Sequence, residues 1–528
     1  MAKGYLAIVL HAHLPFVRHP EHQDSIEENW FYEAVTEVYI PLLLVLEGLL
    51  ADGVDFRLTF SLTPTLASML LDPLLQSRYV RRIERLMALA EKEIARTAGQ
   101  PEIHQLARLY SQRFLGTRDA FLNRYKSNLV EAFRKFQEQG KIEILGSAAT
   151  HAYLPLLSVN PSAVRAQIRT GIEYHEQVFG RRPKGFWLPE CGFFPGVDRM
   201  LREQDIRFTI LETHGVTRAE PRPKRGVYAP IYCPSGLAAF GRDPESSRQV
   251  WSSKEGYPGD YDYREFYRDI GYDLSIDYLR PYVHPGGFRM DTGLKYYRIT
   301  GKTDHKEPYV PGWAESKAET HAGNFMFNRQ KQIEFLASVM DRRPLIVAPY
   351  DAELFGHWWY EGPAWLNHLV RKIACQQESI RLITLSEYLE EYPLNQVAVP
   401  AMSSWGYEGF SDTWLNAKND WIYRHLHRAS DAMERLIQDE SRRSSLALRA
   451  LAQARRELFL AQASDWAFMI NSGQMTEYAA QRTKRHLLRF YRLNEQIQSD
   501  AIDEGVLRDW EARDNIFSSA PTPYALEG

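Results

Sequence analysis

Short apolar runs rich in β-branched and aromatic residues recur along the chain, separated by longer segments with helical spacing. The runs are Tyr5–Leu10, Phe56–Ser61, Ile142–Gly146, Gly185–Leu188, Phe208–Leu211, Leu345–Tyr350 and Ile380–Leu385. Apolar strands that alternate with helices are typical of a parallel sheet covered on both faces. We therefore predict an α/β fold in which about seven strands close, or nearly close, into a barrel.

Polar side chains follow several of these runs at the point where each run ends. They are His11 and His13 after the first run, Thr150 and His151 after the third, Pro189 and Glu190 after the fourth, Glu212 and His214 after the fifth, and Asp351 and Glu353 after the sixth. The carboxyl ends of barrel strands share one face, where catalytic groups from distant parts of a sequence meet. The pattern predicts an active site on that face.

Two segments interrupt the alternation, and the chain changes character near its end. Residues 75–140 are charged with helical spacing, which predicts an inserted helical subdomain. Residues 217–310 are rich in Gly, Pro, Tyr and Arg, which predicts long loops over the active face. Helical spacing dominates beyond Pro400. We predict a catalytic barrel over 1–400 and a helical domain over 401–528 that contributes to the substrate cleft.

The composition excludes several classes of partner. The chain has 528 residues with 64 Lys and Arg against 67 Asp and Glu, a formal net charge of −3. Without a basic excess, neither nucleic acid nor an anionic membrane surface is an expected partner. No uninterrupted apolar stretch approaches the ~18 residues of a membrane span.

Cysteine and aromatic usage narrow the picture further. The three cysteines, Cys191, Cys233 and Cys375, are too few and too widely spaced for a disulfide framework or a metal clip. This predicts a protein of the reducing cytoplasm. Aromatic residues make up 12% of the chain, a surplus that suits an uncharged, polyhydroxylated ligand.

Two carboxylates are the strongest candidates for chemistry. Glu190 ends an apolar run and precedes Gly192, and Asp351 ends another run. Each has a structural alternative, a buried ion pair for Glu190 and a helix N-cap for Asp351. Together on one barrel face and among aromatic residues, they match the nucleophile and the acid of glycosidic bond cleavage.

The histidines and the late tryptophans also carry alternatives. His11 and His13 could belong to a metal site, which would need a further ligand from among His151, His214, Asp351 and Glu353. The favoured interpretation is that both histidines are neutral and bind sugar hydroxyls. The run Ser403–Tyr407, with Trp414 and Ser464–Trp466, offers indoles that either stack on sugar rings or fill a helical core.

Four motifs in order resemble the signature regions of glycoside hydrolase family 57. They are His11–Pro15, Trp187–Phe193, Ala348–His357 and Ser403–Gly406. Within that family the whole chain is similar to the 1,4-α-glucan branching enzymes. The resemblance implies a (β/α)7 barrel with an inserted helical subdomain and a C-terminal α-helical domain. It also implies a retaining double displacement, without metal or other cofactor, in which Glu190 is the nucleophile and Asp351 the general acid/base.

The resemblance also implies a set of glucan-binding residues. They are Arg264 and Gly287 in the long loops, with Arg268 and Gly286 as rivals, Trp405 and Asp465 near the end, and His11, His13 and Trp30 at the donor subsites. Family branching enzymes carry a Tyr at the tip of a mobile loop that excludes water, and the comparison places Phe240 there. Tyr232 is a possible substitute, and the balance between transfer and hydrolysis depends on this position.

The resulting hypothesis is an enzyme that cleaves α-1,4-glucan and transfers the chain to a 6-hydroxyl. Its partner would be amylose or a glycogen-like polymer, and the protein a monomer or small homo-oligomer. Three alternatives stay open: an α-amylase or 4-α-glucanotransferase with the same carboxylates, a metal-dependent deacetylase or mannosidase on a related barrel, and an inactive glycan-binding protein.

Overall fold

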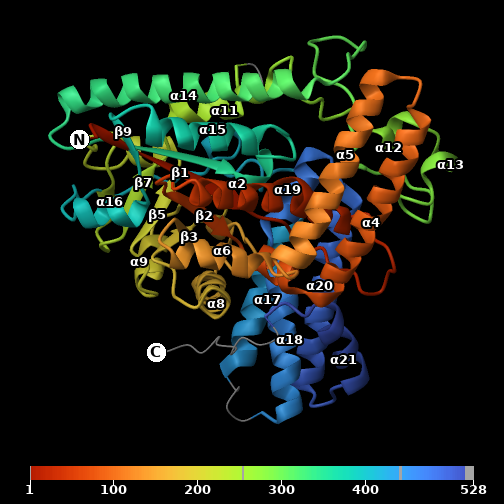
Figure 1. Ribbon diagram of the computed structural model, residues 1–528. Helices are drawn as coiled ribbons and strands as arrows, with labels where there is room; N and C mark the ends of the chain where they lie inside the picture. Colours follow the sequence, from red (N-terminus) through yellow and green to blue (C-terminus); the bar gives the residue numbers. More distant parts are fainter. Residues whose placement is uncertain (1, 253–254, 439–442, 518–528) are drawn as a thin grey trace.

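The computed structural model describes residues 2–252, 255–438 and 443–517, and its centre is a strongly curled sheet (Figure 1). The strands are β1 (Gly4–Ala12), β2 (Leu58–Leu62), β3 (Ile142–Ser147), β4 (Gly185–Trp187), β5 (Phe208–Leu211), β6 (Ile231–Tyr232), β7 (Ala238–Gly241), β8 (Leu345–Asp351) and β9 (Ile380–Leu382). Their order is β6-β7-β5-β4-β3-β2-β1-β8, and β9 also pairs with β1.

Every pairing except β6 with β7 is parallel, so the sheet from β7 through β8 curls as a seven-stranded parallel wall. Just past β7, the Asp243 N–H donates to the Val347 carbonyl at 2.9 Å and links the two ends of this wall. The register places His11 beside Ser61 on one side and beside Asp351 on the other. The predicted α/β barrel is thus confirmed, nearly closed between β7 and β8.

Strand β7 lies inside the 217–310 segment, which was predicted to be loop. Its sequence, Ala238–Gly241, has no β-branched residue and was too short to stand out. All seven predicted apolar runs do form strands, β9 among them, but β9 pairs only with β1 beside the main path. The missing wall strand was therefore β7.

Phe240 belongs to β7 and is 1% exposed, so its placement at a loop tip is wrong. Its ring packs inside the barrel against Phe208, with 5.6 Å between ring centroids. The Tyr232 hydroxyl donates to the Pro393 carbonyl, outside the residues that line the cleft described below. Neither residue shields the site from water in this structure.

Alternate residues along each strand divide between two cores. Tyr5, Ala7 and Val9 of β1 fill the barrel interior together with residues of β5, β7 and β8. Leu6, Ile8 and Leu10 face outward into the larger core beneath the helices. Burial on both faces explains why these strands read as continuous apolar runs.

Helices cover the outside of the barrel. They are α1 (Glu28–Ala34) and α2 (Ile40–Ala51), joined by the π-helical turn η1 (Val35–Tyr39), then α3 (Pro64–Leu71), α4 (Pro73–Arg96), α5 (Pro101–Asp119), α6 (Leu129–Glu138), α7 (Leu154–Leu157), α8 (Pro161–Phe179), α9 (Val197–Arg202), α10 (Thr213–Thr217), α11 (Pro244–Trp251), α12 (Ile270–Asp273), α13 (Ile276–Leu279), α14 (Pro311–Val339), α15 (Gly362–Cys375) and α16 (Leu385–Glu391). Helices α4 and α5 form an antiparallel pair beside α12 and α13 (Figure 1).

The last part of the chain is helical, as predicted. It contains α17 (Trp421–Gln438), α18 (Ser445–Ala461), α19 (Ser464–Ser472), α20 (Thr476–Gln498) and α21 (Glu504–Arg513). The short α19 was not predicted as a separate helix. The expected domain boundary at 400 stays a prediction, and the end of the expected domain, 518–528, lies outside the described residues.

The helical stretch Glu28–Ala51 is long and apolar enough to span a membrane, and 61% of its most apolar window is buried inside the fold. Its residues belong to the core under the helices, where α2 packs against α15. Its apolarity is therefore explained by packing within the protein.

Candidate active site

A cleft of about 1110 Å³ opens at the carboxyl ends of the barrel strands. Its walls come from the strand ends, the segment 14–34, the loops around 266–291 and 351–358, and the segments at 405–414 and 465–475. Strand ends are where a barrel places its catalytic groups, so this cleft is the candidate active site.

Glu190 is held in a short 3₁₀ turn, Pro189–Cys191, directly after β4. The backbone of Glu190 has φ +60° and that of Cys191 has φ +51°, a left-handed conformation that non-glycine residues adopt at some cost. The Trp405 Nε1–H donates to Glu190 Oε2 at 2.8 Å, and the Ser464 hydroxyl donates to Oε1 at 3.2 Å. The turn and both donors fix the carboxylate at the cleft.

Asp351 is the last residue of β8, next to His11 in the register of the sheet. Burial, together with the nearby Glu190 carboxylate, raises the pKa of Asp351 to about 7, and Arg242 opposes both effects. Burial also raises the pKa of Glu190 to about 7, against the stabilising hydrogen bond from Trp405. Two carboxyl groups with these values share a proton near neutral pH.

The hydrogen bonds decide which member of the pair is ionised. Glu190 accepts hydrogen bonds from Trp405 and Ser464, and such donors favour the negative form. Within the part of the chain that the structure describes, no donor is recorded on the Asp351 carboxyl. The arrangement therefore favours an ionised Glu190 and a protonated Asp351, as a nucleophile and a general acid require.

A third carboxyl, Glu353, lines the same cleft. Burial raises its pKa to about 8. The Tyr39 hydroxyl and the His13 N–H both donate to its Oε1 atom, at 2.6 and 3.2 Å. Glu353 is thus a mainly neutral group near pH 7 whose Oε1 atom is an acceptor for two fixed donors.

Three histidines stand together on the barrel face. The rings of His13 and His151 stack with their centroids 3.7 Å apart, and Nε2 of His11 lies 3.0 Å from Nε2 of His151. Burial lowers the pKa values of His11 and His151 well below the usual range for histidine. Both imidazoles are therefore neutral, and their ring nitrogens contact Ser61, Ser464 and each other.

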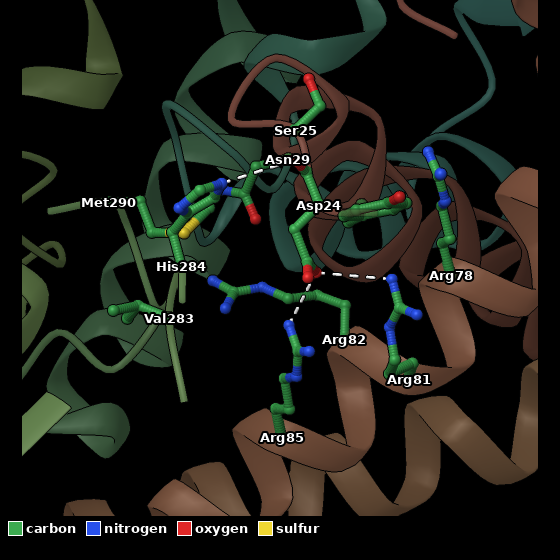
Figure 2. Close-up of a pocket in the computed structure, with 11 residues that line it drawn as sticks. Asp24, Ser25, Asn29, Arg78, Arg81, Arg82, Arg85, Val283, His284 and Met290 are labelled. Atoms are coloured by element: carbon green, nitrogen blue, oxygen red, sulfur yellow. Dashed lines mark hydrogen bonds and ion pairs between the residues drawn. The ribbon is translucent and has the colours of Figure 1, made fainter. Parts of the chain in front are cut away.

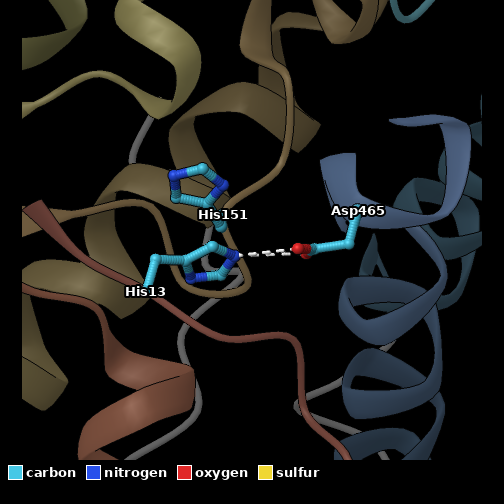
Figure 3. Close-up of side chains that lie close together, drawn as sticks. All are labelled: His13, His151 and Asp465. Atoms are coloured by element: carbon cyan, nitrogen blue, oxygen red, sulfur yellow. Dashed lines mark hydrogen bonds and ion pairs between the residues drawn. The ribbon is translucent and has the colours of Figure 1, made fainter. Parts of the chain in front are cut away.

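His13, His151 and Asp465 bring ligand atoms within 4.8 Å of one another, close enough to share a metal ion (Figure 3). Hydrogen bonds within the protein also explain why these side chains lie together. His13 Nε2 lies 3.1 Å from the Asp465 carboxylate, and His13 Nδ1 lies 3.0 Å from the Thr63 hydroxyl. That the chemistry needs no metal stays a prediction.

The structure brings most of the predicted site residues into one cleft. The cleft is lined by Glu190, Asp351, Trp405, Asp465, His11, His13 and Trp30. They come from the barrel, from α1 and from the part of the chain beyond residue 400, so some of them lie hundreds of positions apart in the sequence. Their roles in catalysis and binding stay predictions that this geometry supports.

Arg264 and Gly287 are not among the described residues that line the cleft. Arg264 is 3% exposed, and its Nη2 pairs with Glu37 Oε1 at 3.2 Å. The other Glu37 oxygen binds His357, which does line the cleft, so Arg264 reaches the site through two intervening side chains. Gly287, with φ +75°, lies in a turn against Arg280, and the assignments of both residues as glucan contacts stay predictions.

Aromatic residues around the carboxylates were predicted from the sequence, but the rings that form the exposed rim of the cleft were not identified. The rim comprises Tyr267, Tyr272, Trp358, Tyr407 and Phe468, each lining the cleft and substantially exposed. Tyr267 is 83% and Tyr407 71% exposed, so both rings are open to a ligand in the cleft. The aromatic surplus was the available signal, but it did not indicate which rings would stay on the surface.

A small second pocket lies between the arginines of α4 and the loop that carries Val283, His284 and Met290 (Figure 2). Arg82 donates to the backbone carbonyls of Tyr282 and Asp291, at 2.9 and 2.7 Å. Arg85 pairs instead with Asp24 at 2.8 Å. Because Asp291 lines the cleft, Arg82 ties the inserted helices to one wall of the active site.

A barrel with paired buried carboxylates and an aromatic-lined cleft defines an enzyme that acts on glycosidic bonds. The sequence matches the model of glycosyl hydrolase family 57 over residues 7–402, three quarters of its length. It also matches the model described as the C-terminal part of 1,4-alpha-glucan branching enzyme, over 425–522. The chain belongs to glycosyl hydrolase family 57. This membership argues against a metal-dependent deacetylase or mannosidase on a related barrel.

Characterised relatives and solved structures agree with this family. A 1,4-alpha-glucan branching enzyme of Thermococcus kodakarensis is 33% identical over 99% of this chain and 79% of its own. The structure of the alpha-amylase AmyC from Thermotoga maritima is 43% identical, covers 98% of both chains and has a TM-score of 0.90. A branching enzyme from Pyrococcus horikoshii is 33% identical, with 100% and 97% coverage and a TM-score of 0.89.

Proposed function

We propose that this protein is a 1,4-α-glucan branching enzyme. The observation that carries the proposal is the similarity along 99% of the chain to a branching enzyme, joined to a match with the branching-enzyme C-terminal model. Asp465 of α19 lies within the matched residues 425–522 and lines the cleft, so the matched region is part of the candidate site.

The proposed reaction begins when the Glu190 carboxylate attacks the anomeric carbon of an α-1,4-linked glucan. Asp351 gives its proton to the departing glycosidic oxygen, and a covalent glycosyl-enzyme forms. Asp351, now ionised, removes the proton from a glucan 6-hydroxyl, which attacks the same carbon and releases Glu190. The new bond is an α-1,6 branch with net retention of configuration.

Water competes with the 6-hydroxyl for the intermediate, so the acceptor must be held close and water kept out. The exposed rings of the rim, Tyr267 and Tyr407 among them, provide flat apolar surfaces against which an incoming glucan can stack. We propose that the rim binds the acceptor chain, while Trp405 holds the nucleophile and faces the donor.

An α-amylase is the second candidate, favoured by the 43% identity with the Thermotoga maritima structure. The same two carboxylates would then deliver the glycosyl group to water. A 4-α-glucanotransferase from Thermococcus litoralis, 14% identical with a TM-score of 0.51, indicates a shared fold alone. Product analysis separates all three activities.

We also propose that the enzyme acts in a reducing cytoplasm on amylose-like or glycogen-like chains, as in glycogen synthesis. Its three cysteines are free, and its net charge of −3 suits a neutral polymer better than an anionic partner. The assembly proposed is a monomer or small homo-oligomer.

The test is incubation of the purified protein with amylose, followed by proton NMR of the linkages and a reducing-end assay. Branching predicts new α-1,6 signals with few new reducing ends, and hydrolysis predicts reducing ends alone. New α-1,4 chain lengths without either signal would identify a 4-α-glucanotransferase. Glu190→Gln should lower turnover by about 10³-fold or more while amylose binding persists, and unchanged turnover would reject the catalytic assignment.

A further inference from the structure

An unbroken chain of hydrogen-bonding groups runs from the barrel wall to Glu190. The Ser61 hydroxyl lies 3.1 Å from Nδ1 of His11, and Nε2 of His11 lies 3.0 Å from Nε2 of His151. Nδ1 of His151 lies 2.9 Å from the Ser464 hydroxyl, which lies 3.2 Å from Glu190 Oε1. All members before Glu190 are buried.

The chemistry of the last link fixes every proton in this chain. An ionised Glu190 can only accept, so the Ser464 hydroxyl donates to it and must itself accept from His151 Nδ1–H. His151 is neutral, so its Nε2 carries no proton and accepts from His11 Nε2–H. His11 is neutral too, and its Nδ1 therefore accepts from the Ser61 hydroxyl.

All four donors consequently point the same way, toward the carboxylate. Hydrogen bonds aligned in one direction polarise one another, and the effect is larger in a buried, low-dielectric site. The two neutral imidazoles pass this polarisation across the barrel face without placing a positive charge beside the nucleophile.

The backbone builds the central link of the chain. His151 has φ +55°, and its carbonyl accepts a hydrogen bond from the Ser464 N–H at 3.1 Å. A β-bridge between Ala152 and Ala463 adjoins this contact. The strained turn after β3 is thus paired with the start of α19, so that His151 and Ser464 meet through both backbone and side chain.

We propose that Ser464 is a positioning residue that orients Glu190 and stabilises its negative form. The His151–His11 pair supports it by polarising the Ser464 hydroxyl. The inference rests on the proposed role of Glu190 as nucleophile. A directed hydroxyl donor on Oε1, opposite the Trp405 indole on Oε2, fixes the carboxylate plane for attack. The same donor stabilises the charge that Glu190 regains when the covalent intermediate breaks down.

Other charged and titratable groups surround Glu190. Asp351 and Asp465 act on it through their charges, and His151 Nδ1 lies 3.8 Å from its Oε1 atom. His13 stacks on His151, and Arg242 lies 5.6 Å from the Trp405 ring. Removing the Ser464 hydroxyl also leaves His151 Nδ1 without that partner, so its effect on the pH profile is compared with that of a variant that keeps the hydroxyl.

The test compares Ser464→Ala with Ser464→Thr, which keeps a hydroxyl. The alanine variant should lower kcat by about 10- to 100-fold, the usual range for a hydrogen bond to a charged group, with KM changed less than about twofold. It should also move the acidic limb of the kcat/KM profile to higher pH, because Glu190 loses a donor to its ionised form. The threonine variant should recover most of the turnover.

Ser147→Ala is the matched control. Ser147 is equally buried at the end of β3. Its hydroxyl donates to the Trp187 carbonyl and is not part of the series of hydrogen bonds that ends at Glu190. If Ser464→Ala behaves like Ser147→Ala in kcat and pH profile, the proposal is overturned. If Glu190→Gln stays active, the proposed function has failed instead.

Ser61, the first group in this series of hydrogen bonds, allows a second measurement that does not depend on the folding of the threonine variant. Ser61→Ala should lower kcat by about two- to fivefold with KM unchanged, since it removes a donor three links from the carboxylate. An unchanged kcat would limit the effect to Ser464 and overturn the extended chain.

Discussion

At the residue scale, one cleft gives three carboxyl groups different tasks through their hydrogen-bond partners. Glu190 has two side-chain donors, one on each oxygen. Glu353 has two donors on the same oxygen, Oε1. Donors on both oxygens favour the carboxylate, whereas donors on one oxygen leave the other free to carry a proton. The partners, and not burial alone, separate the roles of these groups.

Glu353→Gln should keep kcat/KM within about threefold of the wild type at pH 6 to 7. Burial holds the pKa of Glu353 at about 8, so the native group is already mainly neutral there, and a glutamine oxygen can still accept from Tyr39 and His13. Glu353→Ala should lower activity by about 10-fold or more, because it leaves both donors unpaired. Initial rates at the two pH values decide, and a glutamine variant as impaired as the alanine variant would show that the ionised form is required.

Asp351→Asn should stabilise the fold increasingly as pH rises. Asp351 has a folded pKa of about 7, above the ~3.9 of an unfolded chain, so between these values the folded state binds more protons and loses stability as pH increases. Asparagine carries no such cost. The Tm difference from the wild type should be about 1 to 3 °C larger at pH 8 than at pH 5. Asp277→Asn, at an exposed position, is the control. A Tm difference between Asp351→Asn and the wild type that is the same at both pH values would contradict the raised pKa of Asp351.

The sequence was sufficient to predict that Glu190, Asp351 and the histidines meet in one cleft, because strand ends in a barrel share one face whatever the details of packing. Ser464 and Tyr39 could not be predicted in the same way. Each lies on a helical segment, and its partner is fixed by a contact more than a hundred positions away in the sequence. Arg264 has the right chemistry for binding, but the buried Glu37 beside it decides where it points.

At the element scale, the inserted pair α4 and α5 supports the cleft from outside. Long helices with a charged surface look independent in a sequence, but Arg78 and Arg82 of α4 are buried against loops that belong to the site. β7 shows the converse difficulty. Its four residues are small or aromatic, and only the neighbouring β5 makes them a strand.

Arg82→Met should raise KM for amylose by about 3- to 10-fold with little change in kcat. Methionine keeps the apolar volume of the side chain but removes both donors to the carbonyls of Tyr282 and Asp291. The loop between these two residues, which reaches the cleft at Asp291, then becomes more mobile. Steady-state kinetics on amylose provide the measurement. Arg85→Met is the matched control, since it breaks the pair with Asp24 one turn away, and an equal effect from both would show a general weakening of α4.

At the scale of the whole molecule, the barrel and the last helices form one site. Ser403 exchanges backbone hydrogen bonds with Phe193, and the Tyr153 and Trp414 rings stack with their centroids 4.3 Å apart. Gln167 of α8 donates to Gln462, just after α18, at 2.8 Å and accepts from the Thr150 N–H. Buried and fully bonded, Gln167 couples the barrel to the helix that leads into α19.

Calorimetry of the full chain should therefore show a single unfolding transition, and Gln167→Ala should lower both its Tm and kcat. The substitution leaves the Thr150 N–H and the Gln462 amide oxygen buried without this partner, a cost of about 1 to 3 kcal/mol each, and releases the start of α19, where Ser464 holds Glu190. Gln137→Ala is the control, because Gln137 is also buried and its side-chain oxygen accepts from the Ile144 N–H, within the barrel. It should lower Tm while kcat persists. Two separate transitions, or equal kcat in both variants, would show that the helical part folds and acts independently of the barrel.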